Sequence, residues 1–107
     1  MKDHTYTLPD DVRAECLAIL RGYERRTWSE KPEDRRRVEA VRAALAHVGE
    51  DYPQNLRGPI CDGMVRNCLN GRAYPFQSLG LAFMGRSDFY RRRRRFLHDI
   101  AENMGIA

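Results

Sequence analysis

The chain has 107 residues, of which 42% are hydrophobic and 32% charged, and its formal net charge is +4. This length suffices for one globular domain with a small core and is too short for two. No stretch approaches the about 20 apolar residues of a membrane-spanning helix, and the N-terminal sequence MKDHTYTLPDDV lacks the apolar region of a signal peptide. We therefore expect a single cytoplasmic domain that does not enter a membrane.

The cysteines and histidines indicate no cofactor chemistry. Cys16, Cys61 and Cys68 are an odd and sparse set for a secreted disulfide scaffold. Cys61 and Cys68 fall on one helical face, but no histidine or second cysteine pair accompanies them in a zinc-binding pattern. The three histidines are scattered, and neither a nucleophile motif nor a glycine-rich phosphate loop is present. We expect reduced thiols, no metal, no cofactor and no enzymatic activity.

Positive charge is concentrated in the C-terminal half of the chain. Residues 1–53 carry ten Lys or Arg and eleven Asp or Glu, whereas residues 54–107 carry nine Arg and four acids. Seventeen of the nineteen basic residues are arginine, whose planar guanidinium favours bidentate contacts with phosphates and base edges. This bias favours a nucleic-acid partner for the C-terminal half.

Apolar residues recur at helical spacing and no segment alternates as a strand does, so we expect an all-α fold, a small single domain of about five helices. The first helix opens at residues 7–10, where Thr7 can cap it and Pro9 suits a first turn. Asp10 and Asp11 then face the positive end of the helix dipole. Its core-facing stripe comprises Val12, Cys16, Ile19, Leu20 and Tyr23.

A second helix is predicted from about Pro32, after a turn at residues 28–31, to a stop at Gly49. Its narrow apolar stripe comprises Val38, Val41, Leu45 and Val48. Such a stripe packs internally or forms a seam with a second subunit, and internal packing is favoured because a small chain needs every apolar face it has. If the protein forms a homodimer, this helix is the candidate seam.

Glycine and proline punctuate residues 51–59, and a third helix is predicted from Ile60 to the Asn70-Gly71 pair. Its apolar positions are Ile60, Cys61, Met64, Val65 and Cys68. A short fourth helix is predicted over residues 76–83, with Phe76, Leu79 and Phe83 directed inward.

A turn at residues 84–86 then leads to a basic fifth helix that starts at Ser87. A short helix, a turn with glycine and a longer basic helix follow the order of a helix-turn-helix. We therefore divide the single domain, residues 1–107, into a helical support over residues 7–71 and a helix-turn-helix over residues 75–105.

Successive residues of a helix point about 100° apart around its axis, so the five arginines of the fifth helix face different directions and are expected to have different roles. Arg91 and Arg95 point outward, where a recognition helix contacts base edges in the major groove, and Arg92 and Arg94 flank the apolar sector and reach phosphates. Arg93 points into the apolar sector, where we expect it to snorkel or to pair with an acid or carbonyl of another helix. The predicted DNA-binding residues are Arg86, Ser87, Asp88, Arg91, Arg92, Arg94 and Arg95.

Two of these residues also have structural roles, and other partners stay open. Ser87 is expected to cap the helix and Asp88 to complement its dipole. The basic face could instead be solvated, belong to a protein-interaction module such as a phage-encoded inhibitor or adaptor with an acidic partner, or bind RNA. Phe89, Tyr90 and Phe96 fall in the core sector, which favours a packed helix that reads a duplex over one that stacks on single strands.

The stretch GRSDFYRRRRRFLHDIAENMGI resembles the C-terminal helix-turn-helix of phage-encoded transcriptional activators of the RinA and ArpU type. Those motifs place a turn and a serine before Phe-Tyr, a basic run, an apolar pair and an A-x-x-x-G ending. The corresponding residues here are Ser87, Phe89-Tyr90, Arg91 to Arg95, Phe96-Leu97 and Ala101 through Gly105. At the turn, Gly85-Arg86 stands where such motifs often place an apolar residue.

The resemblance covers residues 75–106, and those activators are in turn similar to the promoter-binding region of sigma factors. It implies an all-helical transcription regulator of phage or prophage genes that binds double-stranded DNA, with RNA polymerase as a further partner.

Overall fold

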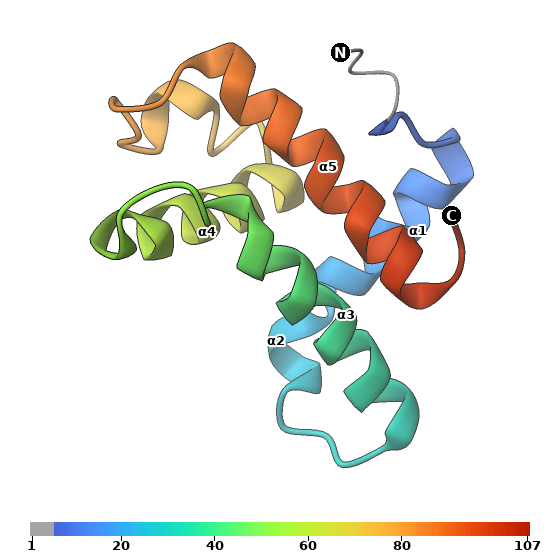
Figure 1. Cartoon of the computed structure of the whole chain (residues 1–107). Helices are drawn as coiled ribbons and strands as arrows, with labels where there is room; N and C mark the ends of the chain where they lie inside the picture. The colour runs from blue at the N-terminus through green and yellow to red at the C-terminus, as the bar shows by residue number, and fades with distance from the viewer. Residues whose placement is uncertain (1–5) are drawn as a thin grey trace.

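The computed structural model describes residues 6–107, and that range contains five α-helices, one short 3-10 helix and no strand (Figure 1). The elements are α1 (Asp10–Arg21), α2 (Tyr23–Arg26), α3 (Pro32–Val48), α4 (Gln54–Leu69), η2 (Phe76–Ser78) and α5 (Arg86–Met104). Their radius of gyration of 13.5 Å is that of one domain of this length. The predicted all-α class is confirmed. No helix within the described range is long and apolar enough to cross a membrane.

Helix α5 is the central element of the fold. It lies across α3, with which it makes the most extensive contacts, and packs on α1 as well (Figure 1). The six largest side chains that are fully buried come from three helices, α1, α4 and α5: Phe89, Phe96, Leu20, Ile60, Met64 and Ile100. Burial of each such side chain stabilises the fold by roughly 1.5–3 kcal/mol, so the core fixes the rotation of α5 about its own axis.

The predicted first helix is interrupted at Gly22, which separates α1 from α2. Arg26 folds back over this residue and donates from Nη1 to the carbonyl of Ile19 at 2.9 Å. A Cβ atom on Gly22 would lie 2.6 Å from the guanidinium carbon of Arg26, so the glycine makes room for this contact. At the other end of α1, Pro9 precedes the first turn and no side chain caps it, so the predicted capping role of Thr7 is wrong.

Helix α3 follows the prediction. It begins at Pro32, carries Glu33 and Asp34 in its first turn and ends before Gly49. Three valines of its stripe, at positions 38, 41 and 48, are buried in the molecule's own core, and Leu45 is half-buried against it. The stripe therefore packs internally, as the size of the chain led us to expect.

Helix α4 begins at Gln54, six residues before the predicted start at Ile60, and Pro59 lies inside it. Proline has no N–H to donate to the carbonyl four residues earlier, which here belongs to Asn55. Because Asn55 is exposed, water can bond that carbonyl, and the helix tolerates Pro59. The prediction that this helix begins only at Ile60, after Pro59, was wrong for this reason.

The predicted fourth helix over residues 76–83 is wrong beyond Ser78, because only η2 forms. Gly80 adopts a positive φ of 73°, a conformation that glycine favours, and the chain leaves the helical path there. Phe76 and Leu79 pack against the core as predicted, and Leu81 and Met84 are buried, whereas Phe83 is 42% exposed and does not turn inward. Helix α5 is thus preceded by a 3-10 turn and an irregular segment, and the first helix of the predicted helix-turn-helix is not confirmed.

Candidate nucleic-acid interface

Helix α5 carries the arginine run and has a glycine beyond each end. Gly85, in extended conformation, precedes the first turn, where Asp88 faces the positive end of the helix dipole. Gly105 ends the helix with a left-handed φ of 74°. The helix begins at Arg86, one residue earlier than predicted, and no side chain caps it, so the predicted capping role of Ser87 is wrong.

The apolar sector expected from helical spacing packs as predicted. Its buried members are Phe89, Phe96, Leu97, Ile100 and Ala101. Tyr90 is half-buried at the edge of this sector. This burial fixes the rotation of α5 about its axis and thereby the direction in which each arginine points.

Arg92 is bound within the fold. Its guanidinium forms two hydrogen bonds with the carboxylate of Asp51, at 2.7 and 2.6 Å, and one with Asp88 at 3.1 Å. It also donates to the carbonyl of Val48 at the C-terminal end of α3, at 2.7 Å, and stacks over the ring of Tyr52 at 5.0 Å. Only 18% of its side chain is exposed, and Arg92 joins α5 to the end of α3. Contrary to the prediction from the sequence, it is not placed to reach phosphates.

These contacts shift the acid-base equilibria of the pair. The hydrogen bonds from Arg92 lower the pKa of Asp51 to about 2, from an ordinary 3.8. The same hydrogen bonds raise the pKa of Arg92, with burial acting against them and Asp88 adding to them. Both groups stay charged at every pH where the fold is expected to function, and the ion pair persists.

Arg93 is half-buried between α5 and α4, as the helical wheel predicted. It lies beside the thiol of Cys68. Burial raises the pKa of this thiol to about 11, and the charge of Arg93 opposes that rise. The Nε atom of Arg93 is buried without a hydrogen-bond partner. Arg93 therefore contributes mainly to packing along its stem.

The first turns of α5 form one wall of a shallow groove of about 300 Å³. The residues that line it are Arg86, Ser87, Tyr90, Arg91 and Arg94, and none of them is acidic. Arg86 is oriented by its position over the ring of Tyr90, 5.3 Å from the centroid, and by a hydrogen bond of 3.4 Å to Gln77 of η2. The groove thus presents three guanidinium groups at the positive end of a helix, an arrangement that attracts anions.

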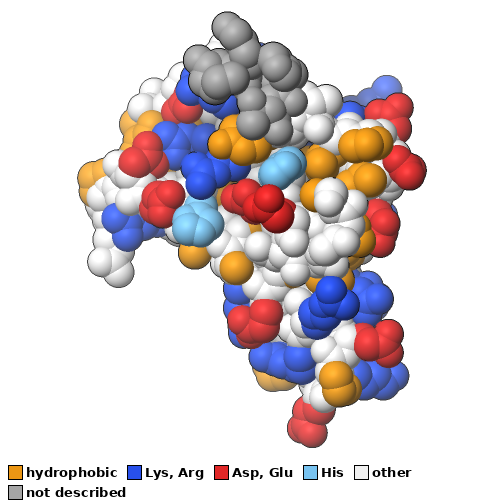
Figure 2. Space-filling model, turned by 45° about the vertical axis from the view of Figure 1, so that its right-hand side comes forward, with side chains coloured by type: hydrophobic (Ala, Val, Ile, Leu, Met, Phe, Trp, Pro, Cys, Tyr) orange, Lys and Arg blue, Asp and Glu red, His pale blue; other side chains and the backbone are white. Residues whose placement is uncertain are grey.

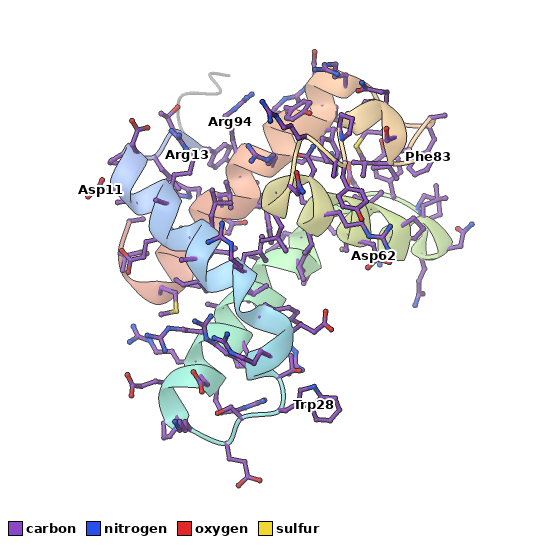
Figure 3. All side chains as sticks on the ribbon, turned by 180° about the vertical axis from the view of Figure 1, so that it is seen from behind. Asp11, Arg13, Trp28, Asp62, Phe83 and Arg94 are labelled. Carbon is purple, nitrogen blue, oxygen red and sulfur yellow. The ribbon has the colours of Figure 1, made fainter. Side chains whose placement is uncertain are left out.

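A second groove continues this surface toward α1. Its lining within residues 6–107 comprises Tyr6, Thr7, Leu8, Arg13, Arg93, Arg94 and Leu97, none of which carries a carboxylate. Arg94 lines both grooves, and Figure 3 shows it on the same side of the molecule as Arg13 of α1. Arg13 is held by the carbonyl of Leu8 and by Asp10, each at 3.2 Å. The two grooves form one surface with five arginines, which we call the basic grooves.

A cavity of about 380 Å³ lies on another side of α5 and has mixed charge. Its lining comprises Tyr6, His47, Val48, Glu50, Asp51, Asp88, Arg91, Arg92, Arg95 and Phe96. The three carboxylates balance the three arginines, so this cavity does not attract anions as the basic grooves do. Arg95 is exposed, as predicted, and lies 3.7 Å from the carboxylate of Asp99.

The structure brings four of the seven predicted residues together in the basic grooves: Arg86, Ser87, Arg91 and Arg94. Asp88 lies next to them and pairs with Arg92 and, at 3.7 Å, with Arg91. Arg92 and Arg95 line the cavity of mixed charge instead.

Several residues of the grooves were not predicted as DNA-binding, among them Tyr90 and Arg13. Tyr90 was assigned to the core, although its spacing of four residues from Arg86 puts both on one helical face. Arg13 was assigned no role, and no sequence pattern links it to α5, because the two meet only through the packing of α1 on that helix. Comparison with known proteins found no matching family model, curated protein or solved structure.

Proposed function

We propose that the protein binds double-stranded DNA through the basic grooves, with the N-terminal half of α5 directed at the major groove, and that it regulates transcription. The observation that carries the proposal is the pair of adjoining grooves that share Arg94 and whose described lining residues include five arginines and no acid. In the grooves the arginines outnumber the carboxylates of the described residues, whereas the three arginines of the mixed-charge cavity are matched by three carboxylates.

The physical basis is phosphate recognition by arginine. Guanidinium groups form bidentate hydrogen bonds with phosphate oxygens, and each phosphate that they neutralise releases condensed counterions from the duplex. Arg86 and Arg94 suit this role at the two edges of α5. Ser87 and Arg91, both exposed near the start of the helix, suit contacts with base edges, as the first turns of a recognition helix make.

The aromatic residues favour a duplex over a single strand. Phe89 and Phe96 are buried, and the ring of Tyr90 is covered on one side by Arg86. Proteins that bind single strands without regard to sequence usually expose aromatic rings on which bases stack. The basic grooves offer charge and hydrogen-bond donors rather than open rings.

The regulatory part of the proposal rests on the resemblance to phage activators of the RinA and ArpU type. In that scheme α5 is the counterpart of the recognition helix, and RNA polymerase is a second partner. Because residues 79–85 are not helical, α5 would be supported by α3 and α1 rather than by the preceding helix of a helix-turn-helix.

The test of the nucleic-acid class is fluorescence anisotropy of the full chain with labelled duplex DNA, single-stranded DNA and duplex RNA of equal length, over a range of salt concentrations. We expect the tightest binding to duplex DNA, with log affinity falling linearly with log salt at a slope that corresponds to about three to five phosphates. Equal affinity for single strands, or preference for duplex RNA, would contradict the DNA proposal.

A second candidate function is a protein-interaction module, and one exposed residue favours it. Trp28 is 87% exposed at the tip between α2 and α3, far from the basic grooves (Figure 3). Its loop is braced by a 2.7 Å hydrogen bond from Ser29 to Asp34, so the indole is presented on a fixed support. Tryptophan is enriched among residues that dominate protein interfaces. Absence of binding to every nucleic acid, even at low salt, would favour this candidate.

A further inference from the structure

The C-terminal half of α5 carries a cluster of metal-ligating side chains apart from the basic grooves. His98, Asp99 and Glu102 each offer a ligand atom, and these atoms all lie within 4.8 Å of one another. His98 and Glu102 are four residues apart and therefore lie on adjacent turns of one helical face. The face in Figure 2 shows both histidines of the described residues, with acidic side chains between them.

Helix α3 carries a further histidine, His47, in its last turn, outside this group of three. His47 acts electrostatically on Asp99, as do His98 and Arg95 of α5. The Nδ1 atom of His47 lies 3.0 Å from Oε1 of Glu50, and this contact fixes the ring and leaves Nε2 for another ligand. A carboxylate that orients a histidine in this way is a common feature of protein metal sites.

The polar atoms of the cluster are not satisfied by one another. Nδ1 of His98 is buried without a hydrogen-bond partner, and the nearest carboxylate oxygen, Oδ1 of Asp99, is 4.0 Å away. The ring of His98 is held in place by an edge contact with Tyr6, at 5.5 Å between centroids. The side chain of Asp99 is only 17% exposed, and Nε of Arg95 lies 3.7 Å from its carboxylate. A buried imidazole nitrogen and a desolvated carboxylate would both gain from a cation placed between them.

We propose that His98, Asp99 and Glu102 bind a divalent transition-metal ion of the zinc class, with His47 of α3 as the fourth ligand. Imidazole nitrogen combined with carboxylate oxygen suits zinc, cobalt and nickel, whereas magnesium and calcium require mainly oxygen ligands. Bonds of about 2.0–2.2 Å would require the side chains to close in by roughly 1 Å, which rotation of the exposed Glu102 allows. The ion would join α3 to α5.

Arg95 offers a substitution that should strengthen metal binding, whereas loss of a ligand should weaken it. Its Nε lies 3.7 Å from Asp99, and its positive charge competes with that of the ion. Titration of the full chain with Co²⁺, followed by visible absorption and by calorimetry, should show one ion per chain and no thiolate charge-transfer band. His98→Ala should weaken binding more than about tenfold, and His47→Ala about tenfold. Arg95→Gln should strengthen it severalfold.

The matched control is His4→Ala, which removes the third histidine of the chain, outside the described residues. It should leave the affinity for cobalt unchanged, and circular dichroism should show that each variant retains its helices. Binding that survives His98→Ala, or that His4→Ala abolishes instead, would overturn the proposed site. A thiolate band would assign the ion to the cysteines and overturn it equally.

Discussion

Five identical residues in a row have different surroundings, and Arg92 differs most. Its partners are Asp51 and the carbonyl of Val48, which lie 41 and 44 positions away in the sequence. The helical wheel assigned to Arg93 the structural role that Arg92 has, because the wheel describes only the helix itself. The positions of acceptors on another helix decide which arginine is bound.

Arg92→Ala should lower the free energy of unfolding by about 2 kcal/mol, because it removes several charge-assisted hydrogen bonds and leaves the carbonyl of Val48 without this donor. Arg91→Ala, at an exposed position, should change it by less than about 0.5 kcal/mol. Urea unfolding of the two variants and the wild type measures both. Equal destabilisation by the two substitutions would show that Arg92 does not join the helices in solution.

The same ion pair predicts how stability depends on pH. The pKa of Asp51 is lowered from 3.8 to about 2 in the folded chain, so the unfolded chain binds a proton on this group more readily. The stabilisation from Asp51 is therefore complete above about pH 5 and is lost as the pH falls toward 2. NMR titration of the Asp51 carboxyl carbon should give the low pKa, and Arg92→Ala should return it to the ordinary range. An unchanged pKa in that variant would exclude Arg92 as the cause.

At the scale of the elements, the sequence predicts the ends and the apolar faces of helices best where these depend on residues close together in the chain. The start of α3 at Pro32 and its end before Gly49 follow from capping preferences, and the apolar face of α5 follows from helical spacing. The start of α4 was missed because Pro59 breaks a helix only where its lost hydrogen bond cannot be replaced. Solvent exposure, which depends on the tertiary fold, decides that.

The candidate site could be predicted in part for the same reason. Arg91 and Arg94 were assigned from the helix alone, and the structure places both in the basic grooves. Arg13 and Arg92 depend on how α1 and α3 pack against α5, and a single sequence does not encode that packing in a readable pattern.

The segment before α5 offers a test of backbone conformation with two matched glycines. Gly80 has a φ of 73°, whereas Gly85 is extended, and a Cβ atom would meet nothing within 4 Å at either. Gly80→Ser should therefore destabilise the fold by about 1 kcal/mol, because a side chain disfavours the left-handed region. Gly85→Ser should stabilise it by a few tenths of a kcal/mol, since serine can cap α5. Thermal unfolding measures both, and a loss of stability at Gly85 alone would contradict the assigned conformations.

At the scale of the whole molecule, α5 divides the charge of the chain among different surfaces. Its first turns and α1 form the basic grooves, Arg92 and Arg95 face a cavity of balanced charge, and His98 begins the cluster for which we propose a metal. Trp28, which is 87% exposed, lies at the end of the molecule opposite to Arg94 (Figure 3). The arginine run thus contributes both to stability and to the proposed binding, and the proposed function depends on the arginines that line the basic grooves.

The most direct test of the DNA proposal compares the salt dependence of duplex binding for Arg94→Ala, Arg91→Ala and Arg25→Ala, the last an exposed arginine on α2 outside the basic grooves. All three variants lose one positive charge. We predict that each groove substitution weakens binding by roughly 1 kcal/mol, about fivefold, and lowers the salt slope by about 1, while Arg25→Ala changes neither. Equal losses in all three variants would mean that DNA responds only to net charge, and the basic grooves would not be its binding site.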